Sequence, residues 1–423
     1  MRSQLTWTTL AELVVMASGI LVLKLAAQFL GPAGFGEYTV TRRAVNLLYL
    51  PLVLGLGIAV PRYISITLAG AMPGFSARSF GFAALTAGLT PVFLAMLLLN
   101  FFPGAASRIL FGTKTLEGLV LPATLALGGI AMHLMVYAVL RGHRQMALAN
   151  SLQLINNGIV PVAVFLISSH SAASVIATTG ATWIAISGLA LLAILVANGR
   201  QERSTLDVRK HLATLLRFGL PRVPGEFALV GLFAIPALIA LREQGIVEAG
   251  HFSAGMSVLT TIAGAFAPIG LLVLPHASAQ VATGDLSGMR NLVLRLSAAG
   301  LALAACGVIV GEVLVPYFVR WYFGAAFVPA IPVIRICLLG AIPYSLYVIL
   351  RNFLDALDVK AVNSRNLVIS LVLLVGLCAV RPRVEWMAMS LVAALTLLSA
   401  LSARATRVRL KPTREASPVP LPA

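Results

Sequence analysis

The sequence predicts an all-α polytopic membrane protein built from two six-helix bundles that are related by an axis along the membrane normal. Three observations predict this fold. First, 59% of the 423 residues are hydrophobic and only 11% are charged, whereas a soluble globular domain has about 25% charged residues. Second, apolar stretches long enough to cross a bilayer recur from one end of the chain to the other. Third, the second half of the chain repeats short motifs of the first, which indicates a duplicated unit.

The hydropathy pattern predicts about twelve membrane helices, because each apolar stretch approaches the roughly 20 residues that a crossing needs. The predicted helix cores begin, in chain order, at Leu10, Ala44, Phe80, Leu119, Leu148, Ser174, Leu215, Ala249, Asn291, Phe327, Asn366 and Val384. A transmembrane β-barrel is excluded, since its strands would be short and alternating. We expect the first stretch to be a membrane helix rather than a signal peptide, because Glu12 interrupts its start and the apolar run continues past Lys24 to Leu30.

The two halves of the chain share ordered motifs at nearly one offset. "GPAGFGEYTV", which begins at residue 31, aligns with "GIVEAGHFSA", which begins at residue 245, and "RILFG" aligns with "RWYFG". The matched pairs are Gly31 with Gly245, Gly36 with Gly250, Gly112 with Gly324 and, after a short insertion, Asn150 with Asn363. Because each unit has an even number of crossings, its two copies have the same orientation in the membrane.

This duplication predicts the domain organisation. We expect a bundle at residues 1–198, a polar cytoplasmic linker at 199–214, a second bundle at 215–404, and a disordered, basic and proline-rich cytoplasmic tail at 405–423. The segment "GPAGFGEYTVTRR" at 31–43 has no strand before it and is therefore not a phosphate loop. We expect a short outer hairpin, with Gly31 and Pro32 ending the first helix.

The formal net charge of +17 is explained first by topology. Most of the arginines and lysines fall in the loops that share one side with both ends of the chain, which by the positive-inside rule predicts that both termini are cytoplasmic. Contact with anionic membrane lipids is also expected. Nucleic-acid binding is excluded, because the chain has no soluble module to carry it.

Four segments resemble the polysaccharide-exporter branch of the multidrug/oligosaccharidyl-lipid/polysaccharide superfamily. They are "FLGPAGFGEY", "LGLGIAVPRYIS", "LRGHRQMALANSLQLINNGIVPVAVFL" and "WYFGAAFVPAIPVIRI". The resemblance implies a transporter rather than an enzyme: a flippase that turns an undecaprenyl-pyrophosphate-linked oligosaccharide, of the O-antigen or capsule type, from the cytoplasmic to the outer leaflet of the bacterial inner membrane. A polysaccharide polymerase and glycosyltransferases are the expected partners.

The resemblance also implies bent helices around a cationic cavity. Glycines and prolines interrupt the second predicted helix (Pro51, Gly55, Gly57 and Pro61) and the eighth (Pro268, Gly270 and Pro275). Interruptions at corresponding places in two halves are a sequence indication of a transport path. Ordinary membrane helices also tolerate these residues.

A charged pyrophosphate can cross the membrane interior only where fixed cations replace its water. Arginine suits this task, because its planar fork binds two phosphate oxygens and stays protonated. Lys24 and Arg335 are the first candidates, since both lie well inside predicted helices; each could instead snorkel or pair with a buried acid. Arg62 and Arg222 near the cytoplasmic entrance and Arg43 near the opposite mouth follow, with interfacial anchoring as the alternative.

Coupling to H⁺ or Na⁺ would need a carboxylate in the cavity. Glu226 and Glu12 are the candidates, although either could simply pair with a nearby arginine. No metal or other cofactor is expected. Two other functions stay open: a multidrug exporter of the same superfamily, which would favour an acidic cavity, and a membrane enzyme of lipid-linked glycan assembly, which would generally need a larger loop outside the membrane than this chain offers.

Overall fold

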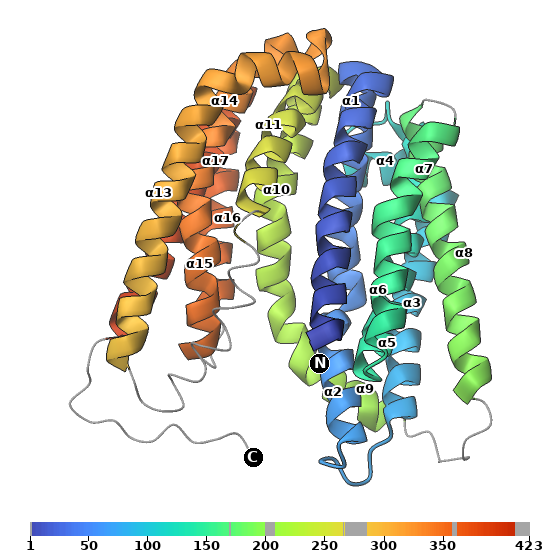
Figure 1. Ribbon diagram of the computed structural model, residues 1–423. Coiled ribbons are helices and arrows are strands. Elements are labelled where there is room, and N and C mark those ends of the chain that lie inside the picture. Colours follow the sequence, from blue (N-terminus) through green and yellow to red (C-terminus); the bar gives the residue numbers. More distant parts are fainter. Residues whose placement is uncertain are drawn as a thin grey trace.

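The computed structural model describes residues 2–168, 171–198, 208–264, 266, 286–357 and 362–410. Within these ranges the regular secondary structure is helical, and no strand occurs. Figure 1 shows two bundles side by side, with α1 to α8 in one and α10 to α17 in the other. The prediction of an all-α protein with two bundles is confirmed.

The helices follow the predicted order of crossings. The N-terminal bundle contains α1 (Arg2–Val53), α2 (Leu56–Leu68), α3 (Ala77–Phe101), α4 (Pro103–Phe111), α5 (Val120–Gly142), α6 (Met146–Gln153), α7 (Val160–Ile167) and α8 (Ala172–Asn198). After α9 (Val208–Gly219), the C-terminal bundle contains α10 (Val223–Gln244), α11 (Ile246–Gly264), α13 (Leu286–Phe318), α14 (Ile331–Leu339), α15 (Ala341–Leu357), α16 (Val362–Val380) and α17 (Val384–Arg409). Ten described helical spans are long and apolar enough to cross a membrane.

The first of these spans makes two crossings, because the chain reverses at Gly31. Gly31 has φ 63° and ψ −177°, outside the helical region, and α2 returns to the end of the bundle that carries the N-terminus (Figure 1). The expected end of the first helix at Gly31 and Pro32 is confirmed, whereas the expected hairpin over 31–43 is wrong, because residues 32–43 are helical. Glycine can adopt the positive φ that this turn needs, and proline fits the first position of a helix. The second leg of α1 therefore begins at Pro32 rather than near Ala44.

The second half repeats this turn. Gly245 lies between α10 and α11 with φ 94° and ψ −178°, almost the backbone conformation of Gly31. Gly36 and Gly250 then pack directly against each other: a Cβ on Gly36 would lie 2.3 Å from the carbonyl oxygen of Ile246, and one on Gly250 would lie 2.4 Å from that of Pro32. This pair of duplicated motifs thus occupies equivalent positions, and the two bundles meet at equivalent glycines.

The second crossing is interrupted at Leu54 and Gly55, both of which have positive φ. Pro51 and Pro61 lie inside helical segments on either side of this break. The prediction of a broken second helix is confirmed, with the break at the glycine rather than at a proline. The corresponding prediction for Pro268, Gly270 and Pro275 falls outside the described residues.

The predicted linker and tail are partly helical. Residues 208–214 form the start of α9, whose His211 accepts a hydrogen bond at Nε2 from the backbone N–H of Ser76 at 3.0 Å. The helix thereby packs against the N-terminal bundle before the chain enters the other one. At the far end α17 continues to Arg409, into the predicted tail. Residues 199–207 and 411–423 fall outside the described residues.

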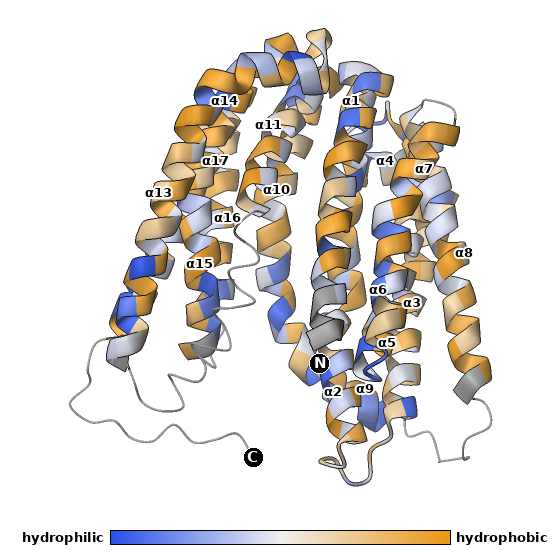
Figure 2. Ribbon diagram, in the orientation of Figure 1, coloured by the Kyte–Doolittle hydropathy of each residue, from blue (hydrophilic) through white to orange (hydrophobic). Residues whose placement is uncertain are grey.

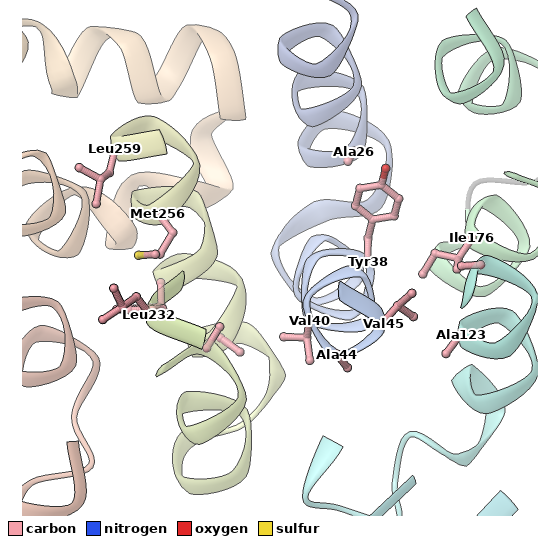
Figure 3. Close-up of a cluster of buried hydrophobic side chains, with 14 of the residues drawn as sticks. Ala26, Tyr38, Val40, Ala44, Val45, Ala123, Ile176, Leu232, Met256 and Leu259 are labelled. Carbon is pink, nitrogen blue, oxygen red and sulfur yellow. The ribbon is translucent and has the colours of Figure 1, made fainter. Parts of the chain in front are cut away.

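The second leg of α1 lies between the two bundles. In Figure 3, Val45 points toward Ile176 and Ala123 of the N-terminal bundle, while Leu232 and Met256 mark the neighbouring α10 and α11. Both of these helices pack against α1. Hydrophobic residues cover much of the outer helices α8 and α13, and hydrophilic residues gather near the end where α1 begins (Figure 2).

Candidate transport cavity

A cavity of about 520 Å³ lies between the bundles, walled by both legs of α1 and by α10, α11 and α15. Among the described residues that line it are three arginines, Arg42, Arg43 and Arg351, and no carboxylate. Its remaining polar lining comes from Thr39, Asn46, Ser257, Thr260 and Tyr344. We call it the arginine cavity. Its wall can bind an anion, because fixed guanidinium groups would replace the water that the anion loses.

Arg43 crosses the bundle interface. Its guanidinium Nη1 donates a hydrogen bond to the backbone carbonyl of Phe233 on α10. The expected position at an outer mouth is wrong, because residues 32–43 are helical and place Arg43 about three turns past Gly31. Arg43 thus lies deeper in the protein than the sequence indicated.

Arg42 and Arg351 join Arg43 at the cavity wall. The guanidinium carbon of Arg42 lies 5.3 Å from the centre of the Tyr38 ring. The Nη1 of Arg42 donates a hydrogen bond to the Tyr38 hydroxyl at 3.3 Å. Arg351 Nε lies 3.8 Å from Asp355 Oδ2, with both side chains about half exposed, so this ion pair is weak.

Neither residue was a leading candidate from the sequence. A signal for Arg351 exists, since Tyr344, Val348 and Arg351 stand at positions i, i+4 and i+7 of α15. Side chains at this spacing share one helix face, and all three line the cavity.

A second cavity of about 870 Å³ adjoins the first and has a mostly apolar wall from α1, α11, α13 and α14. Leu23 and Ser257 line both cavities. Lys24 belongs to this apolar cavity, where its Nζ lies 4.1 Å from the centre of the Trp321 ring. Next to it, the Tyr322 hydroxyl donates to the carbonyl of Ile20 at 2.5 Å. Lys24 is therefore held by an aromatic ring and is not among the residues that line the arginine cavity.

Arg62 and Arg222 converge on one aromatic ring. The guanidinium carbon of Arg62 lies 4.7 Å, and that of Arg222 3.7 Å, from the centre of the Phe218 ring. Both side chains are exposed, and neither is among the residues that line the two cavities. The structure brings these two predicted residues together, at the junction of α2 with the start of the C-terminal bundle.

Arg335 lies elsewhere. Its Nε is 3.5 Å from Glu312 Oε2, and its Nη2 donates to the Glu312 carbonyl at 3.4 Å. It lines neither cavity. Arg335 therefore pairs with an acid, which was the alternative that the sequence left open for it.

The two predicted carboxylates differ in setting. Glu226 is half buried on α10, one turn before Leu229 and Val230 of the arginine cavity, and it experiences the charges of Arg351 and Arg222. Glu12 is exposed on α1. Among the described residues, no group of His, Cys, Asp and Glu side chains could hold a metal ion.

The family model of "Polysaccharide biosynthesis protein" matches residues 2–279, about two thirds of the chain. The chain belongs to the polysaccharide biosynthesis protein family. It is 31% identical over 170 residues to a lipid III flippase of Escherichia coli (strain K12), and the match spans 38% of each protein.

Solved structures resemble this member of the family over almost its full length. Lipid II flippase MurJ in an inward closed conformation matches with a TM-score of 0.73 at 14% identity, over 95% of this chain and 87% of that one. An inward-facing multidrug resistance MATE transporter of the MOP superfamily matches with a TM-score of 0.72 at 14% identity, over 92% and 94% of the two chains. The protein therefore has the two-bundle fold of these membrane transporters.

Proposed function

We propose that the protein is a flippase, which moves an undecaprenyl-pyrophosphate-linked oligosaccharide from the cytoplasmic to the outer leaflet of the bacterial inner membrane. The observation that carries this proposal is the contact between an apolar cavity and an arginine-walled cavity at Leu23 and Ser257. A polyprenyl pyrophosphate has the same two parts, an apolar chain and an anionic group, joined directly. The family and the partial match to a lipid III flippase support the same conclusion.

In this proposal the arginines replace the hydration of the pyrophosphate. Arg42, Arg43 and Arg351 are positioned before the substrate arrives, so the anion meets oriented charges rather than hydrocarbon. The apolar cavity holds the first isoprene units, and the rest of the prenyl chain stays in lipid. Alternating access then moves the charged group past the glycine contact between the bundles.

The orientation and the coupling belong to the same proposal. In this proposal both termini are cytoplasmic, because the basic residues are concentrated in the loops on that side. H⁺ or Na⁺ coupling is assigned to Glu226, because this carboxylate lies one turn from the cavity wall and within reach of the charge of Arg351. Glycosyltransferases act before this step, and a polysaccharide polymerase acts after it.

Deletion of the gene tests the proposal. The expected result is loss of surface polysaccharide together with accumulation of its lipid-linked precursor on the cytoplasmic side. Restoration by the wild-type gene and not by an Arg43→Ala variant would support the arginine cavity. Unchanged surface polysaccharide, with a gain in susceptibility to cationic drugs, would favour a multidrug exporter instead. The three arginines on the cavity wall argue against that alternative, since they repel a cationic drug.

A further inference from the structure

A third cavity, of about 380 Å³, lies inside the N-terminal bundle between α1, α5, α6, α7 and α8. Arg42 and Asn46 line both this cavity and the arginine cavity, so the two spaces adjoin. Its volume is within the range of about 300–1,000 Å³ that small-molecule sites occupy. We call it the amide cavity, because Asn46, Gln153 and Asn157 contribute to its wall.

Asn157 and Gln153 are held in place by a buried network. His133 Nε2 lies 3.0 Å from Gln153 Oε1 and 3.1 Å from Asn157 Nδ2. The network continues on the far side of the ring, where His133 Nδ1 lies 3.1 Å from Asn156 Nδ2. That amide also donates to Ser187 at 3.0 Å. The two amides at the wall therefore have fixed orientations, and both of them are half buried and line the cavity.

The sequence explains why this network can form. Residues Leu154–Ile159 form a π-helical turn, in which the N–H of Val160 bonds to the carbonyl of Ile155. The next bond of that pattern would join residue 161 to Asn156, but Pro161 has no N–H. The indole N–H of Trp183 donates to the Asn156 carbonyl instead. π-Helical turns within α-helices are frequently found at functional sites.

Several polar atoms at this cavity have no partner within the described part of the chain. The half-buried side chains of Asn46 and Thr179 line the cavity, and no hydrogen bond joins either of them to another described group. Buried polar groups normally find a partner. The unpaired groups therefore fit a ligand that both donates and accepts hydrogen bonds.

The chemistry of the wall selects the class of ligand. A metal cation is normally held by carboxylates, whereas the described lining has none and includes Arg42, whose positive charge repels a cation. Side-chain amides and hydroxyls each donate and accept, as sugar hydroxyls do. Tyr38 and Trp183 add aromatic rings to the wall, and such rings can cover the apolar face of a pyranose.

We infer that the amide cavity binds the sugar residue next to the pyrophosphate of the lipid-linked substrate. This inference rests on the proposed function, because it is the arginine cavity that places the phosphates beside Arg42 and Asn46. The apolar, arginine and amide cavities then follow one another in the order of prenyl chain, pyrophosphate and sugar. Thr179, Asn157 and Asn46 bind the sugar hydroxyls, and His133 is a positioning residue that acts through Asn157 and Gln153.

A binding comparison with two lipids tests this inference. One probe is the lipid-linked oligosaccharide that accumulates in cells lacking the protein, and the other is undecaprenyl pyrophosphate, which has no sugar. The full-length protein in detergent should bind the first more tightly. Thr179→Val and Asn157→Ala should each weaken binding of the first by about five- to tenfold, the size expected for a lost hydrogen bond, and leave binding of the second unchanged. Thr182→Val is the matched control, because Thr182 lies on the same helix and bonds only the Thr178 carbonyl.

The outcomes are distinct. Equal affinities of the wild type for both lipids, or variants that bind both lipids as the wild type does, would overturn the sugar site. Stabilisation of the wild type by Na⁺, lost in Thr179→Val without a change in glycolipid binding, would overturn it in favour of a cation site. Failure of the wild type to bind either lipid would refute the proposed function itself.

Discussion

The guanidinium of Arg43 bonds to the backbone carbonyl of Phe233 and so joins the two bundles at the wall of the arginine cavity. The bond couples the site to the arrangement of the bundles, since an anion that binds Arg43 competes with the Phe233 carbonyl for the same donor. Substrate binding would then weaken a contact that holds the bundles together. A charged hydrogen bond of this kind contributes about 1.5–3 kcal/mol.

Replacement of Arg43 should impair transport strongly. We expect Arg43→Ala to lower the transport rate about 10- to 100-fold, as loss of a charged hydrogen bond predicts. Arg43→Lys should recover only part of the rate, because an ammonium cannot bind two phosphate oxygens in the planar geometry of a guanidinium. Surface polysaccharide in a complemented deletion strain reports the rate. A lysine variant as active as the wild type would contradict the bidentate role.

Arg335→Ala is expected to leave transport intact. Its ion pair with Glu312 is partly exposed, with 47% and 32% of the two side chains accessible, and such pairs contribute about 0–1 kcal/mol. Surface polysaccharide and thermal unfolding of the purified variant check this. A transport loss comparable to that of Arg43→Ala, at an unchanged melting temperature, would restore Arg335 to the transport path.

Gly36→Ala should disturb the contact between the bundles. The new methyl group would lie 2.3 Å from the Ile246 carbonyl, so the helices must separate, at a cost of about 1–3 kcal/mol. We expect a lower melting temperature in detergent. Gly19→Ala, on the first leg of α1, is the control, because no heavy atom lies within 4 Å of its added methyl group. Equal melting temperatures of the two variants would show that the glycine contact is not needed.

Trp183→Phe should destabilise the N-terminal bundle by about 1–3 kcal/mol, the cost of leaving a buried carbonyl unpaired. The reason is local, since Pro161 cannot supply the N–H that the Asn156 carbonyl lacks. Thermal unfolding measures the effect. If Pro161→Ala in the Trp183→Phe background failed to recover any stability, this explanation of the π-helical turn would be wrong.

The hydropathy pattern was sufficient for the fold, because a helix in lipid must be apolar along its whole outer surface whatever its neighbours are. It failed at residues 32–43. Glu37, Arg42 and Arg43 resemble a loop in sequence, yet they lie in a helix that runs between the bundles and faces internal cavities. The motif comparison nevertheless found the turn itself, since Gly31 and Gly245 share one backbone conformation.

The site was only partly predictable, since a sequence does not show which face of a membrane helix meets a cavity. Arg43 was named, but at the wrong depth. Arg351 was not named as a site residue, although its spacing from Tyr344 and Val348 indicated a shared face. Arg335 looked buried by its position in a helix, and its partner Glu312 lies 23 positions earlier on a different helix, a relation that appears only once the helices pack.

In the proposed mechanism, Arg42, Arg43 and Arg351 carry the pyrophosphate of a lipid-linked oligosaccharide across the membrane. Reconstitution into liposomes tests it most directly, with the lipid-linked oligosaccharide from deletion cells as the substrate and its exposure on the outer surface as the readout. We predict rapid exposure with the wild type and with Arg335→Ala, and loss of exposure in an Arg43→Ala, Arg351→Ala double variant that folds normally. Wild-type exposure in that double variant would show that these arginines do not carry the pyrophosphate.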